Sequence, residues 1–291
     1  FGDKLPYEDV TVVPAVGNSP NAGVSAKRLG LNAALLTNIG DDRYGTEQLD
    51  RLTEEGIPTE YVRVHEGMGS NYHFVLRYKA ERTILVKHHE YPYELPDPLP
   101  EPRWVYLSSL AENSLPYHEA LADWLSASDT KLAFQPGTFQ IGLGYEKLRR
   151  LYECADLFFC NKEEAQRILE TNEDDMTKLL KAMRERGPER PVITDGTNGA
   201  YVYDGERMLH QPMYPDPKPP VDRTGAGDSF SSTFTSALAL GFDIDTAITW
   251  GPVNSMSVVQ HIGAQEGLLT RAELEEHLHN APESYTTRSL S

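Results

Sequence analysis

The sequence predicts an α/β protein in which helices flank a doubly wound, mostly parallel sheet, with a small antiparallel β-sheet added to it. Short runs rich in aromatic and β-branched residues alternate with helix-length segments along most of the chain. Residues 61–87 break this alternation, because they hold period-two strand patterns with no helix between them. The 291 residues are enough to bury the core of one large domain with a small accessory piece.

Charge and composition disfavour several classes of protein. The net charge of −17 and the pI of about 4.9 disfavour a nucleic-acid partner, whose phosphates would be repelled. The two cysteines, Cys154 and Cys160, lack the spacing of a metal site, and no run of about 18 apolar residues is present to cross a membrane. We therefore expect a cytoplasmic protein that binds small molecules rather than nucleic acid or membrane.

The first part of the chain contains a candidate ligand loop. The elements expected here are a short strand at residues 10–13, a helix at 22–29, a buried strand at 33–40 and a helix from about 41 to 55. Gly17 and Asn18 form the loop before the first of these helices, and Asn21 stands at its start. An asparagine at this position either caps the helix or offers its amide to a ligand, and both roles are open at this point.

We expect residues 61–89, together with residues 1–10, to form a lid over the main domain. Strands are expected at 61–64, 71–78 and 81–87, with Lys79 and Ala80 as a hairpin turn, and the main domain then comprises residues 11–60 and 90–291. A sheet this small needs a cover for its apolar face. This need favours a lid that also contacts a second copy, and it disfavours the alternative of an edge hairpin on the main sheet. Asn71 and Arg82 are candidate substrate contacts on this lid.

From residue 104 onward, strands and helices alternate again. Strands are expected at 104–107, 131–135, 157–161 and 191–194, and helices at 117–125, 144–153, 231–240, 245–261 and 270–277, followed by a loose tail at 286–289. Parallel strands separated by helices bind ligands beyond their carboxyl ends. Gln135 ends one of these strands and is therefore a candidate substrate contact.

Residues 222–228, with the sequence DRTGAGD, lead directly into a predicted helix. A helix N-terminus presents unpaired N–H groups, and Gly225 and Gly227 let a ligand approach the backbone closely, so this stretch is a candidate anion site. Asp228 would place a carboxylate beside the bound anion, where it could take a proton from a hydroxyl that attacks a phosphate. An aspartate in a capped first turn is also common, and the spacing alone supports both interpretations.

The DRTGAGD stretch resembles the C-terminal signature of the PfkB, or ribokinase-like, family of carbohydrate kinases, D-x-T-G-A-G-D. The resemblance implies a ribokinase-like fold in which Asp228 is the catalytic base. It also implies that the amides of Gly225, Ala226 and Gly227 form an anion hole for the transferred phosphoryl group. The resemblance also implies that Gly227 contacts the bound nucleotide.

Two segments near the start of the chain match further motifs of this family. Gly17 and Asn21 resemble the substrate loop G-G-x-x-x-N, which implies that Asn21 holds sugar hydroxyls and that Asn18 lies in the same loop. Val16 stands in place of the first glycine, which leaves the identity of the sugar open. Residues 40–45 resemble the N-terminal signature G-D-D-x-x-G, whose aspartates turn and cap chemistry explains.

Later segments resemble the nucleotide motifs of the family. Asn161 and Glu164 match N-x-x-E, which implies that the asparagine lies by the ATP phosphates and that the glutamate holds Mg²⁺ through water. A capping box explains the same pair structurally. Thr194, Gly196 and Gly199 match the nucleotide loop T-x-G-x-x-G.

The helix that contains Asn254 resembles the adenine-side helix of the family, and in relatives activated by K⁺ an acidic residue matching Asp222 holds that cation. The family also begins with a core strand that carries an acidic sugar ligand. That strand is not visible in this sequence, and we expect the natural chain to begin upstream of Phe1.

Together these resemblances predict an ATP- and Mg²⁺-dependent phosphotransferase that acts on a hydroxyl of a sugar or sugar acid. The same resemblance implies a homodimer joined through the lid sheet. Two alternatives stay open: a nucleoside or vitamin-type kinase of the same superfamily, and a non-catalytic relative that binds a sugar or nucleotide. The lid and the loop around Asn21 would decide which substrate is bound.

Overall fold

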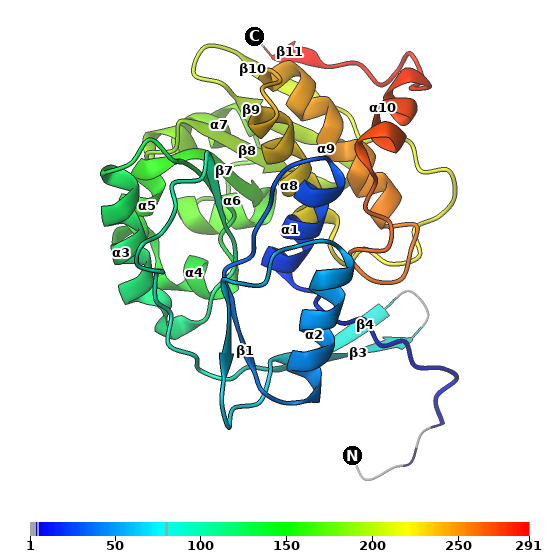
Figure 1. Cartoon of the computed structure of the whole chain (residues 1–291). Helices are drawn as coiled ribbons and strands as arrows, with labels where there is room; N and C mark the ends of the chain where they lie inside the picture. Colours follow the sequence, from blue (N-terminus) through cyan, green and yellow to red (C-terminus); the bar gives the residue numbers. More distant parts are fainter. Residues whose placement is uncertain (1–3, 5, 79–80, 291) are drawn as a thin grey trace.

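The computed structural model describes residues 4, 6–78 and 81–290, and a seven-stranded mixed sheet runs through its centre (Figure 1). The strands, in their order across the sheet, are β11 (Arg288–Leu290), β10 (Met208–Gln211), β9 (Ala200–Tyr203), β8 (Arg190–Thr194), β7 (Ala155–Asn161), β6 (Lys131–Phe134) and β5 (Trp104–Leu107). Strands β5 to β8 are parallel, and the pairs from β8 to β11 are antiparallel. Carboxyl ends of the parallel strands therefore share one edge of the sheet.

Helices cover both faces of this sheet, because its central strands are apolar on both sides. The helices are α1 (Asn18–Arg28), α2 (Arg43–Glu54), α3 (Leu115–Ser126), α4 (Thr138–Leu143), α5 (Tyr145–Cys154), α6 (Lys162–Leu169), α7 (Met176–Glu185), α8 (Ala226–Ala239), α9 (Ile244–Val258) and α10 (Arg271–His279). In β7, Leu157 and Phe159 pack with Phe234 of α8. Phe158 and Cys160 alternate with them and join the core beneath α3, α5 and α7. This layered α/β arrangement confirms the predicted fold class (Figure 1).

A second, parallel sheet contains β1 (Thr37–Gly40) and β2 (Val62–His65), with α2 connecting them. Its core contains Val24 of α1, Ile39 of β1 and Leu52 of α2. The expectation that the strand near residue 61 belongs to the antiparallel sheet was wrong, because β2 pairs with β1 instead. Period-two alternation describes a half-buried strand and does not say which neighbour it pairs with.

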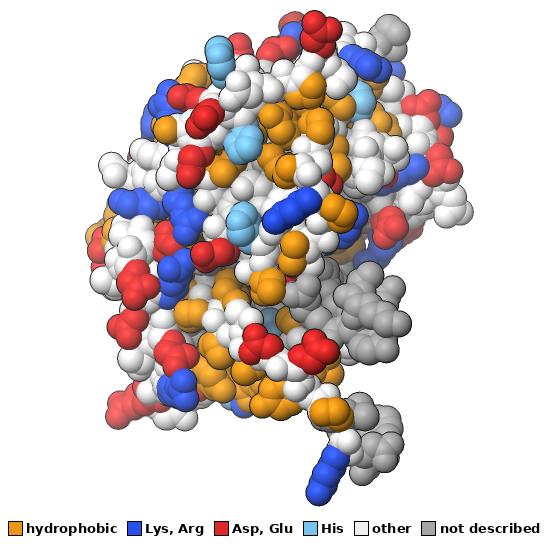
Figure 2. Space-filling model, turned by 90° about the vertical axis from the view of Figure 1, so that its right-hand side faces the viewer, with side chains coloured by type: hydrophobic (Ala, Val, Ile, Leu, Met, Phe, Trp, Pro, Cys, Tyr) orange, Lys and Arg blue, Asp and Glu red, His pale blue; other side chains and the backbone are white. Residues whose placement is uncertain are grey.

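The antiparallel sheet is a hairpin of β3 (Tyr72–Tyr78) and β4 (Glu81–Lys87). On one face Phe74 and Leu85 are cross-strand partners and are 57% and 52% exposed, and Val75 and Ile84 form a comparable exposed pair on the other face. Residues 79–80, the expected turn, lie outside the described residues. Figure 2 shows apolar side chains gathered on the lower part of the face that carries this hairpin.

The base of the hairpin is fixed to the main body by buried polar contacts. Asp42 caps α2 and accepts hydrogen bonds from Gly45 N and from both the backbone N and Oγ of Ser70. Burial alone would raise the pKa of Asp42, but the bonds from Ser70 and Gly45 outweigh it and lower that pKa. Beyond β4, the buried Tyr91 donates its hydroxyl to Gly69 O at 2.5 Å. Both ends of the hairpin are thus anchored.

Several expected boundaries differ from the structure: the strand expected at 33–40 covers only Thr37–Gly40, and the helix expected at 231–240 begins at Ala226. Residues 10–13 form no strand, and Val10 and Val12 are largely exposed. Helix α1 begins at Asn18, because Pro20 is tolerated in a first turn, where its missing N–H has no helical partner to lose. The tail expected to be loose contains β11, which pairs with β10 at the edge of the main sheet.

Candidate active site

The carboxylate of Asp228 lies at the centre of the candidate site. It belongs to the first turn of α8, and only 8% of the residue is exposed. Gly225 is the N-cap of this helix and adopts a left-handed φ of 83°, which favours glycine. The local sequence therefore brings a carboxylate into the protein at a helix N-terminus.

Three side-chain amides surround this carboxylate. Asn18 Nδ2 donates to Asp228 Oδ1 at 2.8 Å, and Gln135 Nε2 donates to the same oxygen at 3.4 Å. Asn21 Nδ2 donates to Oδ2 at 2.9 Å. The structure thus brings together residues that are more than 200 positions apart in the sequence. Gly17 lies in the same group, since its N–H donates to Asn21 Oδ1 at 3.3 Å.

Two helix N-termini meet at Asp228. Asn18 and Asn21 occupy the first turn of α1, and Asp228 occupies the first turn of α8. Each N-terminus carries a partial positive charge that favours an anion. Burial raises the pKa of Asp228 above its ordinary value, and the hydrogen bonds from Asn21, Asn18 and Gln135 act in the opposite direction.

The backbone before α8 is packed against the end of α9 and the loop that follows it. Val221 N and Asp222 N both donate to Val259 O, and Ser255 Oγ donates to Ala226 O at 2.6 Å. A Cβ atom on Gly225 would lie 2.4 Å from the Cβ of Ala264, so no other residue fits there. A Cβ atom on Gly227 would approach nothing closer than Gln135 Nε2 at 3.8 Å. The second glycine therefore keeps space open beside Asp228 rather than relieving a clash.

The predicted nucleotide residues lie on the same edge of the sheet as Gln135. Gln135 follows β6, Asn161 ends β7, and Thr194 ends β8. Asn161 and Thr194 are register partners. Because neighbouring strands are about 4.8 Å apart, this row extends about 10 Å from Gln135 to Thr194. Asp228 contacts the start of the row, so the candidate base and the candidate nucleotide loops face one shared region.

Asn161 and Glu164 form the expected capping box at the start of α6. Glu164 N donates to Asn161 Oδ1 at 2.8 Å, and Asn161 N donates to Glu164 Oε2 at 2.9 Å. Burial raises the pKa of Glu164. Gly196 and Gly199 both have left-handed φ values in the turn after β8, where Gly199 N donates to Gly196 O. This turn is a tight glycine-dependent loop.

Two predicted site residues, Asn254 and Asn71, are not brought to this region as ligand-facing side chains. Asn254 is fully buried and bonds to Thr233 Oγ1 and Leu269 N, so its amide joins α9 to α8 and to the following loop. Asn71 Oδ1 accepts a hydrogen bond from His89 N and joins the two ends of the hairpin. Arg82 belongs to β4, and its side chain lies outside the described part of the chain.

Asp222 shapes the turn before α8. Its Oδ1 accepts hydrogen bonds from Thr224 N at 3.0 Å and from Thr224 Oγ1 at 2.7 Å.

Among the described residues, no group of three or more His, Cys, Asp or Glu side chains gathers as metal ligands would. Within the same residues, no helix has the length and apolar character needed to cross a membrane.

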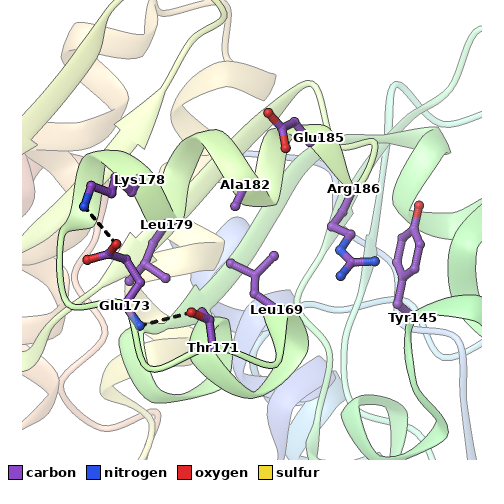
Figure 3. Close-up of a pocket in the computed structure, with 9 residues that line it drawn as sticks. All are labelled: Tyr145, Leu169, Thr171, Glu173, Lys178, Leu179, Ala182, Glu185 and Arg186. Atoms are coloured by element: carbon purple, nitrogen blue, oxygen red, sulfur yellow. Dashed lines mark hydrogen bonds and ion pairs between the residues drawn. The ribbon is translucent and has the colours of Figure 1, made fainter.

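A separate pocket of about 510 Å³ lies beside α5 and α7 (Figure 3). It is lined by Tyr145, Leu169, Thr171, Glu173, Lys178, Leu179, Ala182, Glu185 and Arg186. Both of its cations have partners, since Lys178 pairs with Glu173 at 3.0 Å and Arg186 stacks 4.5 Å from the centre of the Tyr145 ring. None of the predicted site residues lines it, so the pocket does not bear on the chemistry around Asp228.

Two residues that were not predicted as site residues contact the amides around Asp228. Tyr106 of β5 donates its hydroxyl to Gln135 Oε1. Gln265 Nε2 donates to Asn21 Oδ1 at 3.2 Å. The sequence offered a signal only for Gln265, whose loop follows the helix that resembles the adenine-side helix.

Comparison with known proteins places the chain in a family. The model of the pfkB family of carbohydrate kinases matches residues 9–271. The chain belongs to this family. The DRTGAGD stretch leads into α8 and places Asp228 in the first turn of that helix.

Individual members of the family are similar over nearly the whole chain. Ribokinase of Bacillus subtilis is 28% identical over 95% of this chain and 94% of its own, and nucleoside kinase of Methanocaldococcus jannaschii is 25% identical over 95% and 91%. Among solved structures, an E. coli protein described as a ribokinase II, in complex with ATP and Mg²⁺, has a TM-score of 0.79 with 18% identity, over 96% and 94% of the two chains. The last similarity shows the fold.

The two glycines before and within α8 are expected to respond differently to alanine. Gly225→Ala forces a methyl group against Ala264 at a left-handed φ, so we expect the free energy of unfolding to fall by more than about 1 kcal/mol. Gly227→Ala meets no such contact and replaces a helical glycine, so its stability should match or exceed that of the parent protein. Urea unfolding of both variants measures this difference. Equal losses of stability would contradict the proposed packing of Gly225.

Proposed function

We propose that this pfkB-family protein is an ATP-dependent kinase that phosphorylates a hydroxyl group of a sugar or sugar acid. The observation that carries the proposal is the buried carboxylate of Asp228. It lies at a helix N-terminus and is held by three amides. One of these amides, from Gln135, lies on the edge of the sheet where β7 ends in Asn161 and β8 ends in Thr194. A base, an anion site and a nucleotide-type loop on one edge are the parts that phosphoryl transfer requires.

The chemical step uses few groups. Asp228 accepts the proton of the substrate hydroxyl while the hydroxyl oxygen of the substrate forms a bond to the γ-phosphorus of ATP. ADP leaves with the electrons of the broken P–O bond. The amides of Gly225, Ala226 and Gly227 stabilise the negative charge on the transferred group, with the partial positive charge at the start of α8 adding to the effect. The amides of Asn18, Asn21 and Gln135 keep the base oriented.

The surroundings of Asp228 suit a hydroxyl-rich substrate. Besides the three amides, the first turn of α1 carries Ser19, whose hydroxyl bonds to that of Ser108 at 2.6 Å. Amides and hydroxyls can both donate to and accept from sugar hydroxyls. A nucleoside, whose ribose carries the same groups, is the second candidate because a nucleoside kinase is among the similar proteins.

We further propose that Asn161, Thr194, Gly196 and Gly199 bind the ATP phosphates. Glu164 would hold Mg²⁺ through water, and this single carboxylate fits an ion that binds mainly through phosphate oxygens and water. When bound, Mg²⁺ neutralises charge on the β- and γ-phosphates. We propose K⁺ near Asp222 on the family resemblance alone.

The β3–β4 hairpin is proposed as both the lid and a contact between two copies; of the lid range expected from the sequence, residues 62–65 belong to the parallel sheet with β1. Both faces of the hairpin expose apolar side chains, and only one face can close over a substrate. A patch of this kind on a folded protein indicates a partner. ATP as phosphoryl donor and the free thiols of Cys154 and Cys160 fit a cytoplasmic location.

The proposed activity is tested by measuring ATP consumption against free sugars, sugar acids, sugar phosphates and nucleosides. One sugar or sugar acid should be turned over, and Asp228→Asn should lower kcat by about 100-fold or more because a positioned base is lost. Gly227→Ala, which adds a methyl group beside the base, should lower kcat without loss of stability. Turnover of nucleosides alone would favour the second candidate. Nucleotide binding without turnover of any class would refute the kinase.

The pH dependence of kcat should report Asp228. A protonated carboxyl cannot accept the substrate proton, so kcat falls as the pH falls through its pKa. Because burial raises this pKa, the acid limb should lie above the ordinary value for aspartate, about 3.9. Circular dichroism at each pH controls for unfolding. A limb at or below the ordinary value would show that Asp228 is not the titrating base.

Association through the hairpin is tested by analytical ultracentrifugation. The parent protein should sediment as a dimer, and the double variant Phe74→Glu with Leu85→Glu should be monomeric because two charges would enter the apolar contact. Val12→Glu is the matched control, since Val12 is 66% exposed and lies outside the hairpin. A dimer that survives the double change would place the contact elsewhere.

A further inference from the structure

We propose that Tyr106 and Gln265 are positioning residues that fix which atom of two amide side chains faces Asp228. This inference rests on the proposed function of Asp228 as the base. An amide group can turn either its NH₂ or its oxygen toward a neighbour, and the two choices have opposite effects on a carboxylate. What holds each amide from behind therefore decides whether Asp228 is surrounded by donors.

Tyr106 determines the orientation of Gln135. Its hydroxyl donates to Gln135 Oε1, so the NH₂ group of the same amide points toward Asp228 Oδ1. Burial and the charge of Asp228 raise the pKa of Tyr106 well above its usual value, so its hydroxyl stays a donor at working pH.

Gln265 contributes to the orientation of Asn21, together with the backbone of Gly17. Its Nε2 donates to Asn21 Oδ1, and the backbone N–H of Gly17 donates to the same oxygen. With that oxygen occupied twice, Asn21 Nδ2 faces Asp228 Oδ2. Gln265 is 1% exposed, its Nε2 also donates to Ala15 O, and its Oε1 has no hydrogen-bond partner within the described structure.

The arrangement leaves a defined place for the substrate. An ionised carboxylate has about four acceptor positions on its two oxygens. Asn18 and Gln135 occupy two on Oδ1, and Asn21 occupies one on Oδ2. The remaining position is on Oδ2. A reversed amide of Asn21 would replace its donor to Oδ2 with an oxygen that repels this carboxylate. The two positioning residues thus keep the base both ionised and accessible to one hydroxyl.

The test compares Tyr106→Phe and Gln265→Met with the parent protein. The pKa of Asp228 is measured directly by ¹³C NMR of labelled aspartate carboxyls, assigned with Asp228→Asn. Tyr106→Phe removes the donor that holds the Gln135 amide, and Gln265→Met removes one of the two donors to Asn21 Oδ1. We therefore expect this pKa to rise by about half a unit or more in Tyr106→Phe, and by less in Gln265→Met, where Gly17 N–H still donates to Asn21. With substrate, kcat should fall by about 10-fold with KM for ATP unchanged, and the acid limb should move upward with the pKa.

Two matched variants control for a loss of buried polar contacts. Tyr285→Phe removes a buried hydroxyl that donates to Thr249 O at 2.5 Å. Gln211→Met removes a fully buried amide whose Nε2 has no partner within the described structure. Neither side chain bonds to the amides around Asp228, so both variants are expected to lower stability and leave the pKa of Asp228 unchanged.

The outcomes separate this inference from the proposed function. If the pKa of Asp228 stays at its parent value in both variants while the parent protein turns over substrate, the positioning roles are wrong and the kinase stands. If the pKa of Asp228 rises but no substrate is turned over, the amide network is as inferred and the proposed kinase activity is wrong. Should Tyr106→Phe fail to fold, Gln265→Met decides, because it removes a side chain with one unpaired acceptor.

Discussion

A carboxylate inside a protein must be surrounded by donors, and this requirement organises the molecule around Asp228. The donors come from the first turn of α1 and from the end of β6, while the carboxylate itself belongs to α8. Three segments distant in sequence must therefore pack with an accuracy of a few tenths of an ångström. The apolar layers on both faces of the central sheet supply the rigid frame that makes this possible.

The same frame explains why the two substrates would meet. Carboxyl ends of β6, β7 and β8 lie in a row, and each is followed by a polar residue or a glycine turn. Asp228 reaches this row only at Gln135. The candidate nucleotide residues and the candidate base are therefore placed by the order of the strands rather than by direct contact with one another.

Much of this was predictable from the sequence where the determinants are local. The capping box of Asn161 and Glu164, the glycines around α8 and most parallel strands follow from short patterns. The partner of β2 was not predictable, because its alternation fits either sheet. Likewise the burial of Asn254 and the contacts of Tyr106 with Gln135 depend on residues far away in the chain, and no local pattern reports them.

The meeting of two helix N-termini at Asp228 has a consequence for how a charged nucleotide reaches the site. The chain carries a net charge of −17, so at long range it repels ATP. Helix dipoles act only over the first turn or so, and their attraction begins once the phosphates are already near the sheet edge. Capture is therefore a short-range event preceded by a repulsive approach. Because dissolved salt screens this long-range repulsion more than the short-range attraction, we expect salt to favour association.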